Sequence, residues 1–226
     1  FTNLTQDHLD FHETLEAYFE AKLRLFLDLL PATGAAVVNM DGERSAEVAA
    51  AAHRRGARVL TTGRRGDTLC IRALAPKPSG LDLEVEARGQ VFRLGLPLIG
   101  AFQAENALLA AGIVLASGRA AGEVLPWLDR LPGVPGRMQF AAQARGAGIF
   151  VDYAHTPDAV ETALRAIRPH AQGRVIAIIG AGGDRDRAKR PLMGKAAADN
   201  ADHVIVTDDN PRSEDPAAIR LEILKG

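Results

Sequence analysis

The chain has 226 residues, of which 47% are hydrophobic and 24% are charged, and its formal net charge at pH 7 is −1. These proportions are typical of a globular protein, and the length allows one large or two modest domains. The charge argues against nucleic acid or a membrane surface as a partner, because both usually attract a basic excess. No apolar run is as long as a membrane span, and the single cysteine, Cys70, cannot form an internal disulfide. We therefore expect a soluble protein of the cytoplasm.

The first part of the chain predicts alternating helices and strands. Apolar residues recur at helical spacing over about residues 14–30, and the apolar run at 35–39 predicts a buried strand. A helix over about residues 45–55, capped by Ser45, and a strand at 58–61 follow. Two strands joined by a helix imply a parallel sheet with a right-handed crossover. The expected fold class is α/β.

Further along, the pattern changes twice. Short alternating runs between residues 67 and 98 predict antiparallel strands, and helices are expected at about 100–116 and 120–130. The segment Leu131–Arg137 then holds two prolines and two glycines in seven residues, which indicates a domain boundary. We expect one domain at residues 1–137, with a mixed sheet, and a second α/β domain at residues 138–226.

In the second domain, three predicted strands end in polar loops. The strands cover residues 148–152, 174–179 and 203–207, and the loops cover 152–158, 180–186 and 207–212. In an open α/β sheet, ligands bind at the carboxyl ends of the strands, because loop amides and helix N-termini converge there. We predict that the three loops lie on one edge and form a ligand site.

The loop that starts with Gly180-Ala-Gly-Gly183 fits no nucleotide-binding pattern. Arg185 stands where G-x-G-x-x-G needs its third glycine, and Gly194-Lys195 is followed by alanine rather than serine or threonine. Flexible glycines followed by four charged residues favour a loop that presents charge to a ligand. A solvated run of ion pairs that caps a helix is the alternative.

The loop at 207–212 offers groups that suit a zwitterion. Arg212 can hold a carboxylate bidentately, and Asp209 with Asn210 can accept hydrogen bonds from an ammonium. An Asx turn that ends at Pro211, with a surface arginine, fits the same residues.

Three further residues have open alternatives. Lys22 falls on or beside the apolar stripe of the first long helix, where a lysine either extends past the core into solvent or has a function. His155 could be a base, a ligand contact or a helix cap, and the residues alone favour the cap. His8, close to His12, Asp7 and Asp10, could hold a metal, although such clusters are more often surface loops.

Six motifs in order along the chain carry a family resemblance. They are Thr2–Asp10, Tyr18–Lys22, Gly133–Arg137, Val151–Pro157, Gly182–Asp186 with Lys189–Pro191, and Asp208–Arg212. Taken together, the chain resembles the Mur ligase family, and within it the members that add diaminopimelate. Such ligases use ATP to phosphorylate a carboxylate of a nucleotide-linked peptide, and an incoming amine then attacks the acyl phosphate. Mg²⁺ and basic groups neutralise the charge that develops.

The resemblance implies a role for each matching residue. It implies a central mixed-sheet ATP-binding domain, followed by a Rossmann-like C-terminal domain that binds the amino acid. His8 and a carbamylated Lys22 would act in catalysis and hold Mg²⁺. The implied ATP contacts are Asn106, Arg137, Asp152 and His155. The implied contacts of meso-diaminopimelate are Arg185, Asp209, Asn210 and Arg212, the last binding its distal carboxylate. The peptide substrate would be UDP-N-acetylmuramoyl-L-Ala-D-Glu.

The chain departs from the family pattern at Gln103 and Gln139, where asparagine and glutamate are usual. The family's N-terminal domain, its phosphate loop and a Gly-Lys-Gly-His-Glu stretch are missing from the sequence, so we expect a fragment that does not hydrolyse ATP on its own. Separately, we expect a monomer. The alternatives are a related ligase that adds L-lysine or a polyglutamate tail to folate, and a non-catalytic amino-acid-binding module.

Overall fold

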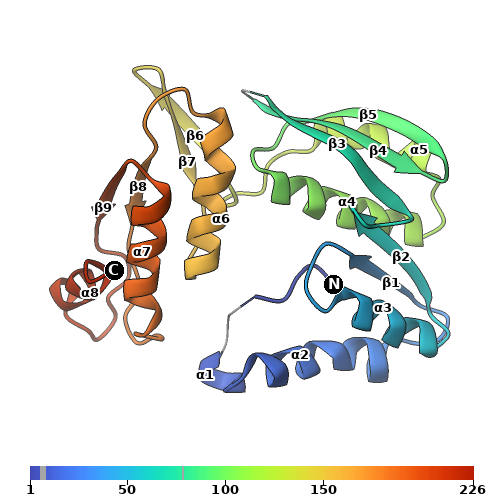
Figure 1. Ribbon diagram of the computed structural model, residues 1–226, viewed down its shortest axis with the longest axis horizontal. Helices are drawn as coiled ribbons and strands as arrows, with labels where there is room; N and C mark the ends of the chain where they lie inside the picture. Colours follow the sequence, from blue (N-terminus) through green and yellow to red (C-terminus); the bar gives the residue numbers. More distant parts are fainter. Residues whose placement is uncertain (6–8, 78) are drawn as a thin grey trace. The chain divides into compact units, whose positions relative to one another are not determined.

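A computed structural model describes residues 1–5, 9–77 and 79–226, with only the backbone of Leu9 and Asp10. The chain divides into two compact units, unit 1 at Phe1–Gly133 and unit 2 at Val134–Gly226. Each unit contains both helices and strands (Figure 1). Among the described residues, no helix combines the length and the apolar character that a membrane crossing requires.

Unit 1 is built on a five-stranded sheet with the strand order β1-β2-β3-β4-β5. The strands are β1 (Ala35–Asn39), β2 (Arg58–Gly63), β3 (Leu69–Lys77), β4 (Gly80–Ala87) and β5 (Gln90–Leu96). The helical elements are α1 (Leu9–His12), α2 (Leu15–Arg24), the π-helix η1 (Leu25–Leu29), α3 (Ser45–Arg54), α4 (Ala101–Ala116), α5 (Ala121–Val124) and the 3₁₀ helix η2 (Leu125–Arg130). Strands β1 to β3 are parallel and β3 to β5 antiparallel, which confirms the predicted mixed sheet.

Strand β1 is buried on both faces, which explains its uninterrupted apolar run. Ala36 and Val38 belong to a core cluster with Phe19 of α2 and with α3. Val37, between them, packs in a separate cluster with Leu109 of α4. Because successive side chains of a strand point to opposite faces, helices must cover both sides of this part of the sheet.

The sequence suggested that Ser45 caps α3, but the structure shows that it does not. It is the first residue of the helix, and Arg44 is the N-cap residue, with a left-handed φ of 59° and no capping hydrogen bond from its side chain. Arg44 instead bonds to the carboxylates of Glu16 and Glu47, and its guanidinium carbon lies 3.9 Å from the centroid of the Phe19 ring. The start of α3 is thus set by contacts with α2, which local sequence cannot reveal.

Unit 2 contains two separate two-stranded sheets. Its elements are β6 (Gln139–Ala144), β7 (Ala147–Val151), α6 (Pro157–Ile167), the 3₁₀ helix η3 (Arg168–His170), β8 (Ile176–Ile179), α7 (Lys189–Asn200), β9 (His203–Val206) and α8 (Pro216–Ile223). Strands β8 and β9 are parallel, as expected of a Rossmann-like unit. Among the described residues, strand β7 pairs with β6 as an antiparallel hairpin, and it does not pair with β8 or β9. The prediction of one edge shared by three strands is therefore wrong.

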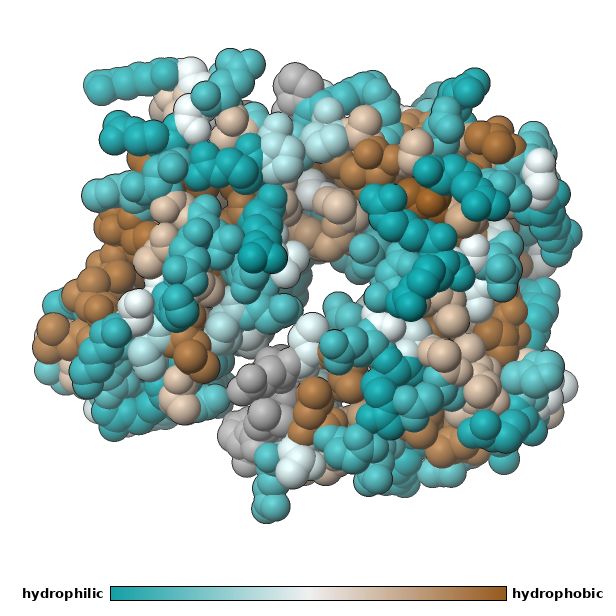
Figure 2. Space-filling model, viewed as in Figure 1, coloured by the Kyte–Doolittle hydropathy of each residue, from teal (hydrophilic) through white to brown (hydrophobic). Residues whose placement is uncertain are grey.

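The core of unit 2 lies between the helices and one face of the β8–β9 sheet. Ala177 of β8 packs with Met193 and Ala197 of α7, whereas its neighbour Ile178 is exposed. Apolar side chains of β9 and α8 are exposed as well, and Figure 2 shows apolar surface at the edge of the view where these elements lie.

The contact between α7 and α8 depends on Gly194. A Cβ at this position would lie 2.0 Å from the carbonyl oxygen of Ile223, so α8 would have to move. In an open helix position, replacing glycine by alanine stabilises by about 1 kcal/mol. We expect Gly194→Ala to destabilise unit 2 by about 1–3 kcal/mol instead, as overpacked cores do. Hydrogen exchange of the amides of α7 and α8 measures the effect.

Gly122→Ala is the matched control, because a Cβ at Gly122 has no atom within 4 Å. This substitution should leave unit 1 equally or more stable, as measured by urea unfolding monitored through Trp127, the only tryptophan. Unchanged exchange rates in Gly194→Ala would show that α8 does not pack this closely on α7.

Candidate functional site

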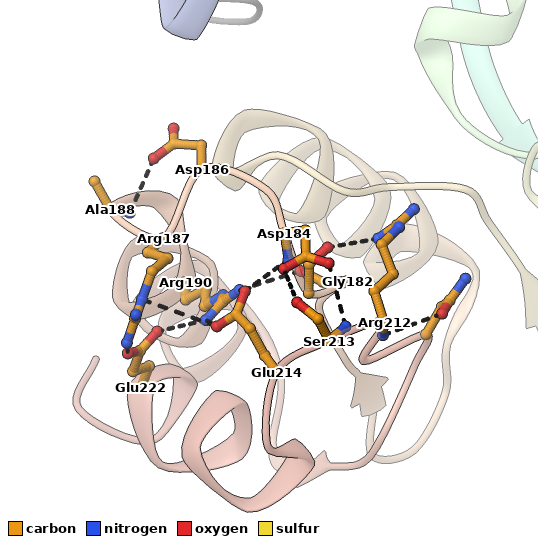
Figure 3. Close-up of polar contacts among 12 residues, drawn as sticks. Gly182, Asp184, Asp186, Arg187, Ala188, Arg190, Arg212, Ser213, Glu214 and Glu222 are labelled. Atoms are coloured by element: carbon orange, nitrogen blue, oxygen red, sulfur yellow. Dashed lines mark hydrogen bonds and ion pairs between the residues drawn. The ribbon is translucent and has the colours of Figure 1, made fainter.

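Two loops of unit 2 interlock at the carboxyl ends of the parallel strands β8 and β9. We call them the β8 loop (residues 180–188) and the β9 loop (residues 207–215). The amide of Gly183 donates to the carbonyl of Asn210 at 2.9 Å, and Nη1 of Arg212 donates to the carbonyl of Gly183 at 2.7 Å. The Asp184 carboxylate accepts bonds from the amide and hydroxyl of Ser213, at 3.2 and 2.6 Å (Figure 3). These two of the three predicted loops do lie on one edge.

Glycine is required where the two backbones meet. A Cβ at Gly183 would lie 1.8 Å from the carbonyl oxygen of Pro211, and one at Gly182 would lie 2.7 Å from Nη1 of Arg212. Real side chains do not come that close, so a side chain at Gly183 would push the loops apart, whereas one at Gly182 would displace only the end of the Arg212 side chain. The glycines predicted to give flexibility instead allow close contact.

Arg190, in the first turn of α7, holds both loops. Its side chain is only 1% exposed. Nη1 donates to Oε2 of Glu214 at 2.8 Å and to Oε2 of Glu222 at 2.7 Å, and Nη2 donates to Oε1 of Glu214 at 2.7 Å. Glu214 also accepts a bond from the amide of Asp184 at 2.6 Å, so it connects Arg190 to the β8 loop (Figure 3). No sequence pattern indicated a role for Arg190 or Glu214.

These contacts shift the acidity of the carboxyl groups. Hydrogen bonds from Arg190, and then from the Asp184 amide, lower the pKa of Glu214 to about 2. Bonds from Arg187 and Arg190 lower the pKa of Glu222, and bonds from Ser213 lower the pKa of Asp184. The network is therefore charged at neutral pH.

The four residues implied to bind diaminopimelate are all exposed on these loops. The side chains of Arg185 and Asp209 make no hydrogen bond or ion pair with any other described residue. Oδ1 of Asn210 accepts a bond from the amide of Arg212 at 3.4 Å, so the Asx turn considered as an alternative is present. Arg212 follows this turn with a left-handed φ of 50°. The turn and a ligand-binding role are thus compatible.

The alternative of a solvated ion-pair run applies to part of the β8 loop. Asp186 accepts a bond from the amide of Ala188 at 2.9 Å, and Arg187 pairs with Glu222. Arg185, between Asp184 and Asp186, is not used in this way. The loop therefore contains both structural charges and a charge that is available to a ligand.

Three residues implied to bind ATP lie in unit 2, and two of them are beside the ring of Tyr153. The guanidinium of Arg137 lies 5.3 Å from the centroid of the Tyr153 ring, and the His155 ring lies 5.4 Å away. Oδ2 of Asp152 accepts a bond from the amide of Met138 at 2.7 Å. Gln139, one of the two departures from the family pattern, accepts a bond from the amide of Gly136 at 2.9 Å.

His155 is not the helix cap that the residues alone favoured. Thr156 caps α6, because its hydroxyl oxygen accepts a bond from the amide of Ala159 at 3.2 Å. Nδ1 of His155 lies 3.0 Å from the carbonyl oxygen of Tyr153. The cap requires the extended backbone that Thr156 adopts, which places His155 one residue too early.

The remaining implied ATP contact, Asn106, is an exposed residue of α4 in unit 1. Its neighbour Glu105 accepts a bond from Nδ2 of Asn39 at 2.9 Å, and burial raises the pKa of Glu105. Asn39 is the last residue of β1, so this bond attaches α4 to the carboxyl end of that strand.

Lys22 is half-buried on α2, with Nζ 4.6 Å from the centroid of the Tyr18 ring. The helix changes to the π-helical form three residues later, at η1. His8 lies outside the described residues. Within the described part of the chain, no three His, Cys, Asp or Glu side chains are grouped so that they could hold a metal ion.

Comparisons with known proteins agree with this architecture. Residues 1–114 match the Mur ligase middle domain, and residues 136–226 match the Mur ligase, glutamate ligase domain. The chain belongs to the Mur ligase family.

Individual relatives support the assignment. A UDP-N-acetylmuramoyl-L-alanyl-D-glutamate–2,6-diaminopimelate ligase of Caulobacter vibrioides is 54% identical over 226 residues, which are 100% of this chain and 46% of the relative. A solved structure of a ligase of the same name is 37% identical with a TM-score of 0.65, covering 100% of this chain and 46% of that one. MurF from Acinetobacter baumannii, at 21% identity and a TM-score of 0.78 over 98% of this chain and 47% of its own, shows the fold alone. The chain thus spans about half the length of the curated relatives it matches.

The low pKa of Glu214 predicts how unit 2 responds to acid. A carboxyl group whose pKa is lower in the folded state stabilises the fold above its unfolded pKa, here 4.5, and this contribution disappears as the pH falls towards about 2. We expect the melting temperature of unit 2 to fall between these pH values, and to fall less steeply in Glu214→Gln. Circular dichroism melts of both proteins across this range measure the difference.

Glu161→Gln is the control, because among the described residues Glu161 is paired only with Arg165, one helical turn away on α6. It should retain the acid response of the unmodified chain. Identical pH profiles for Glu214→Gln and the unmodified chain would mean that Glu214 does not hold the loops through its charge.

Proposed function

We propose that this chain forms part of an ATP-dependent ligase that joins meso-diaminopimelate to UDP-N-acetylmuramoyl-L-Ala-D-Glu, forming ADP and phosphate, in the synthesis of peptidoglycan precursors. The observation that carries the proposal is the interlocked pair of loops in unit 2, which leaves Arg185 and Asp209 without side-chain partners among the described residues. The names of the relatives support the same activity.

The chemistry of the loops suits an amino acid with two ends. Diaminopimelate carries an ammonium and a carboxylate at each end, and the four loop residues implied to contact it offer two guanidinium groups, one carboxylate and one amide. In the proposed complex, Arg212 binds the distal carboxylate, and Asp209 with Asn210 binds an ammonium. L-lysine lacks the distal carboxylate and would leave the arginine without its partner.

We further propose that residues 1–137 belong to the ATP-binding domain and residues 138–226 to the domain that binds the amino acid. Asn106 in the first and Arg137, Asp152 and His155 near the boundary and in the second would contact ATP. ATP phosphorylates the peptide carboxylate, and the amine then displaces phosphate from the acyl phosphate to form the amide. The task of these residues is to bind and orient the nucleotide.

Lys22 fits a role in holding Mg²⁺ once it carries a carbamate. Its half-buried amine can add to dissolved CO₂, forming an N–C bond and releasing a proton, and the product resembles a carboxylate. Mg²⁺ is commonly bound through one or two carboxylates, with waters and substrate phosphates completing its shell. A single protein carbamate, with His8 as the second proposed ligand, is consistent with that preference. Bound Mg²⁺ would neutralise charge that develops on the phosphates.

The carbamate can be detected directly. We expect the chain in ¹³C-bicarbonate to show a carbamate carbon signal by NMR, and Lys22→Arg to lose it. Lys195→Arg, a change at an exposed lysine paired with Asp199, should keep the signal. Absence of the signal from the unmodified chain would remove Lys22 from the proposed metal site.

We also propose that the protein works as a monomer in the cytoplasm, on small-molecule substrates. The buried free thiol of Cys70 fits a reducing compartment.

The amino-acid specificity can be tested on the 226-residue chain. We expect isothermal titration to give tighter binding of meso-diaminopimelate than of L-lysine by about ten- to a hundredfold, the value of a charged hydrogen-bonded pair. Arg212→Met should abolish most of this preference, because methionine keeps much of the length and loses the charge.

Arg174→Met is the matched control, since Arg174 is an exposed arginine before β8, at the other end of the strand. It should keep the preference for diaminopimelate. Equal binding of the two amino acids by the unmodified chain would favour a lysine-adding enzyme or another ligand, and would contradict the proposal.

A further inference from the structure

We propose that Arg190 is a positioning residue for the amino-acid site, and that its buried guanidinium sets the distance between the β8 and β9 loops. Its effect on the loops follows from the structure, whereas the identity of the ligand rests on the proposed function. The motif Lys189-Arg-Pro191 contains this arginine, which has no part in the proposed binding of ATP, Mg²⁺ or the amino acid.

From the first turn of α7, Arg190 contacts both loops. On the β9 loop, the guanidinium makes two bonds to Glu214, which follows Arg212 by two residues. On the β8 loop, Nη2 donates to the carbonyl of Gly182 at 3.3 Å. Glu214 closes the triangle by accepting the amide of Asp184 at 2.6 Å, one residue before Arg185. Arg190 thus acts within two residues of both arginines implied to bind the ligand.

The geometry requires arginine rather than a general positive charge. Glu214 is bound through both of its oxygens by two different nitrogens of the guanidinium, while Nη1 also reaches Glu222 of α8. A planar guanidinium presents its donors in a fixed fork, whereas a lysine ammonium is a single point of charge on a flexible stem. Lysine would keep the charge and lose the fixed orientation of Glu214.

Burial makes the arrangement stiff. The guanidinium is almost wholly removed from water, and its Nε has no hydrogen-bond partner among the described residues. A buried charge must keep its carboxylate partners, because solvent cannot replace them. Glu214 is therefore held against Arg190. This keeps the β9 loop in the position where the Gly183 amide bonds to the Asn210 carbonyl.

Arg190→Lys tests the proposal through local amide exchange in the 226-residue chain. We expect the amides of Gly183, Asp184 and Ser213 to exchange at least about tenfold faster, because each is bonded across the two loops. Amides of α6 should keep their rates within about twofold. The dissociation constant for meso-diaminopimelate should rise about tenfold or more.

Arg187→Lys is the matched control. Arg187 pairs with Glu222 in the same network, but its side chain is 63% exposed and its closest approach to Glu214 is 4.0 Å. The three loop amides should exchange at unchanged rates in this variant. Glu214→Gln is a second test that leaves Arg190 in place, and it should accelerate exchange at the same three amides.

The outcomes separate this inference from the proposed function. Unchanged exchange at the three amides in Arg190→Lys and Glu214→Gln would overturn it, whatever the affinity for diaminopimelate. Faster exchange throughout unit 2 would also overturn it, because Arg190 would then support the fold as a whole. If the unmodified chain binds no diaminopimelate, the proposed function fails, while faster exchange confined to the loops still supports the positioning role.

Discussion

The site in unit 2 depends on the need to neutralise one buried positive charge. Arg190 lies almost fully out of water at the start of α7, so carboxylates must come to it. Glu214 of the β9 loop and Glu222 of α8 both pair with Arg190, and these two ion pairs join α7, the β9 loop and α8. The close contact of the two loops, and the glycines that permit it, follow from this arrangement. Arg190 thus contacts none of the residues implied to bind the ligand, yet its charge orders the loops that carry those residues.

Two groups of charged residues in the two loops have different physical roles. Asp184, Asp186 and Arg187 are satisfied by bonds within the protein, and their effect is to order the backbone. Arg185 and Asp209 project from that ordered backbone without partners among the described residues. A ligand that binds them breaks no hydrogen bond or ion pair among the described residues. Such a loop pair is preorganised for a charged molecule.

Unit 1 positions its candidate residues in another way. Its strand β1 is held between helices on both faces, so the carboxyl end of the strand is a rigid point. Asn39 at that end binds Glu105, which fixes α4 one residue before Asn106. Here regular secondary structure supports the candidate residue, whereas in unit 2 the support comes from loop-to-loop bonds.

The sequence by itself determined the α/β class, the helix and strand positions and the family, because periodicity and motifs are local properties that survive in any arrangement of the elements. It also placed the β8 and β9 loops on one edge, since parallel neighbours end together. Only the tertiary structure decided that β7 pairs with β6, that α3 starts at a turn held by Glu16, and that Arg190 is buried between carboxylates. Each of these depends on residues distant in the chain, whose approach no local pattern records. Arg190 and Arg187 look alike in sequence, and burial alone distinguishes them.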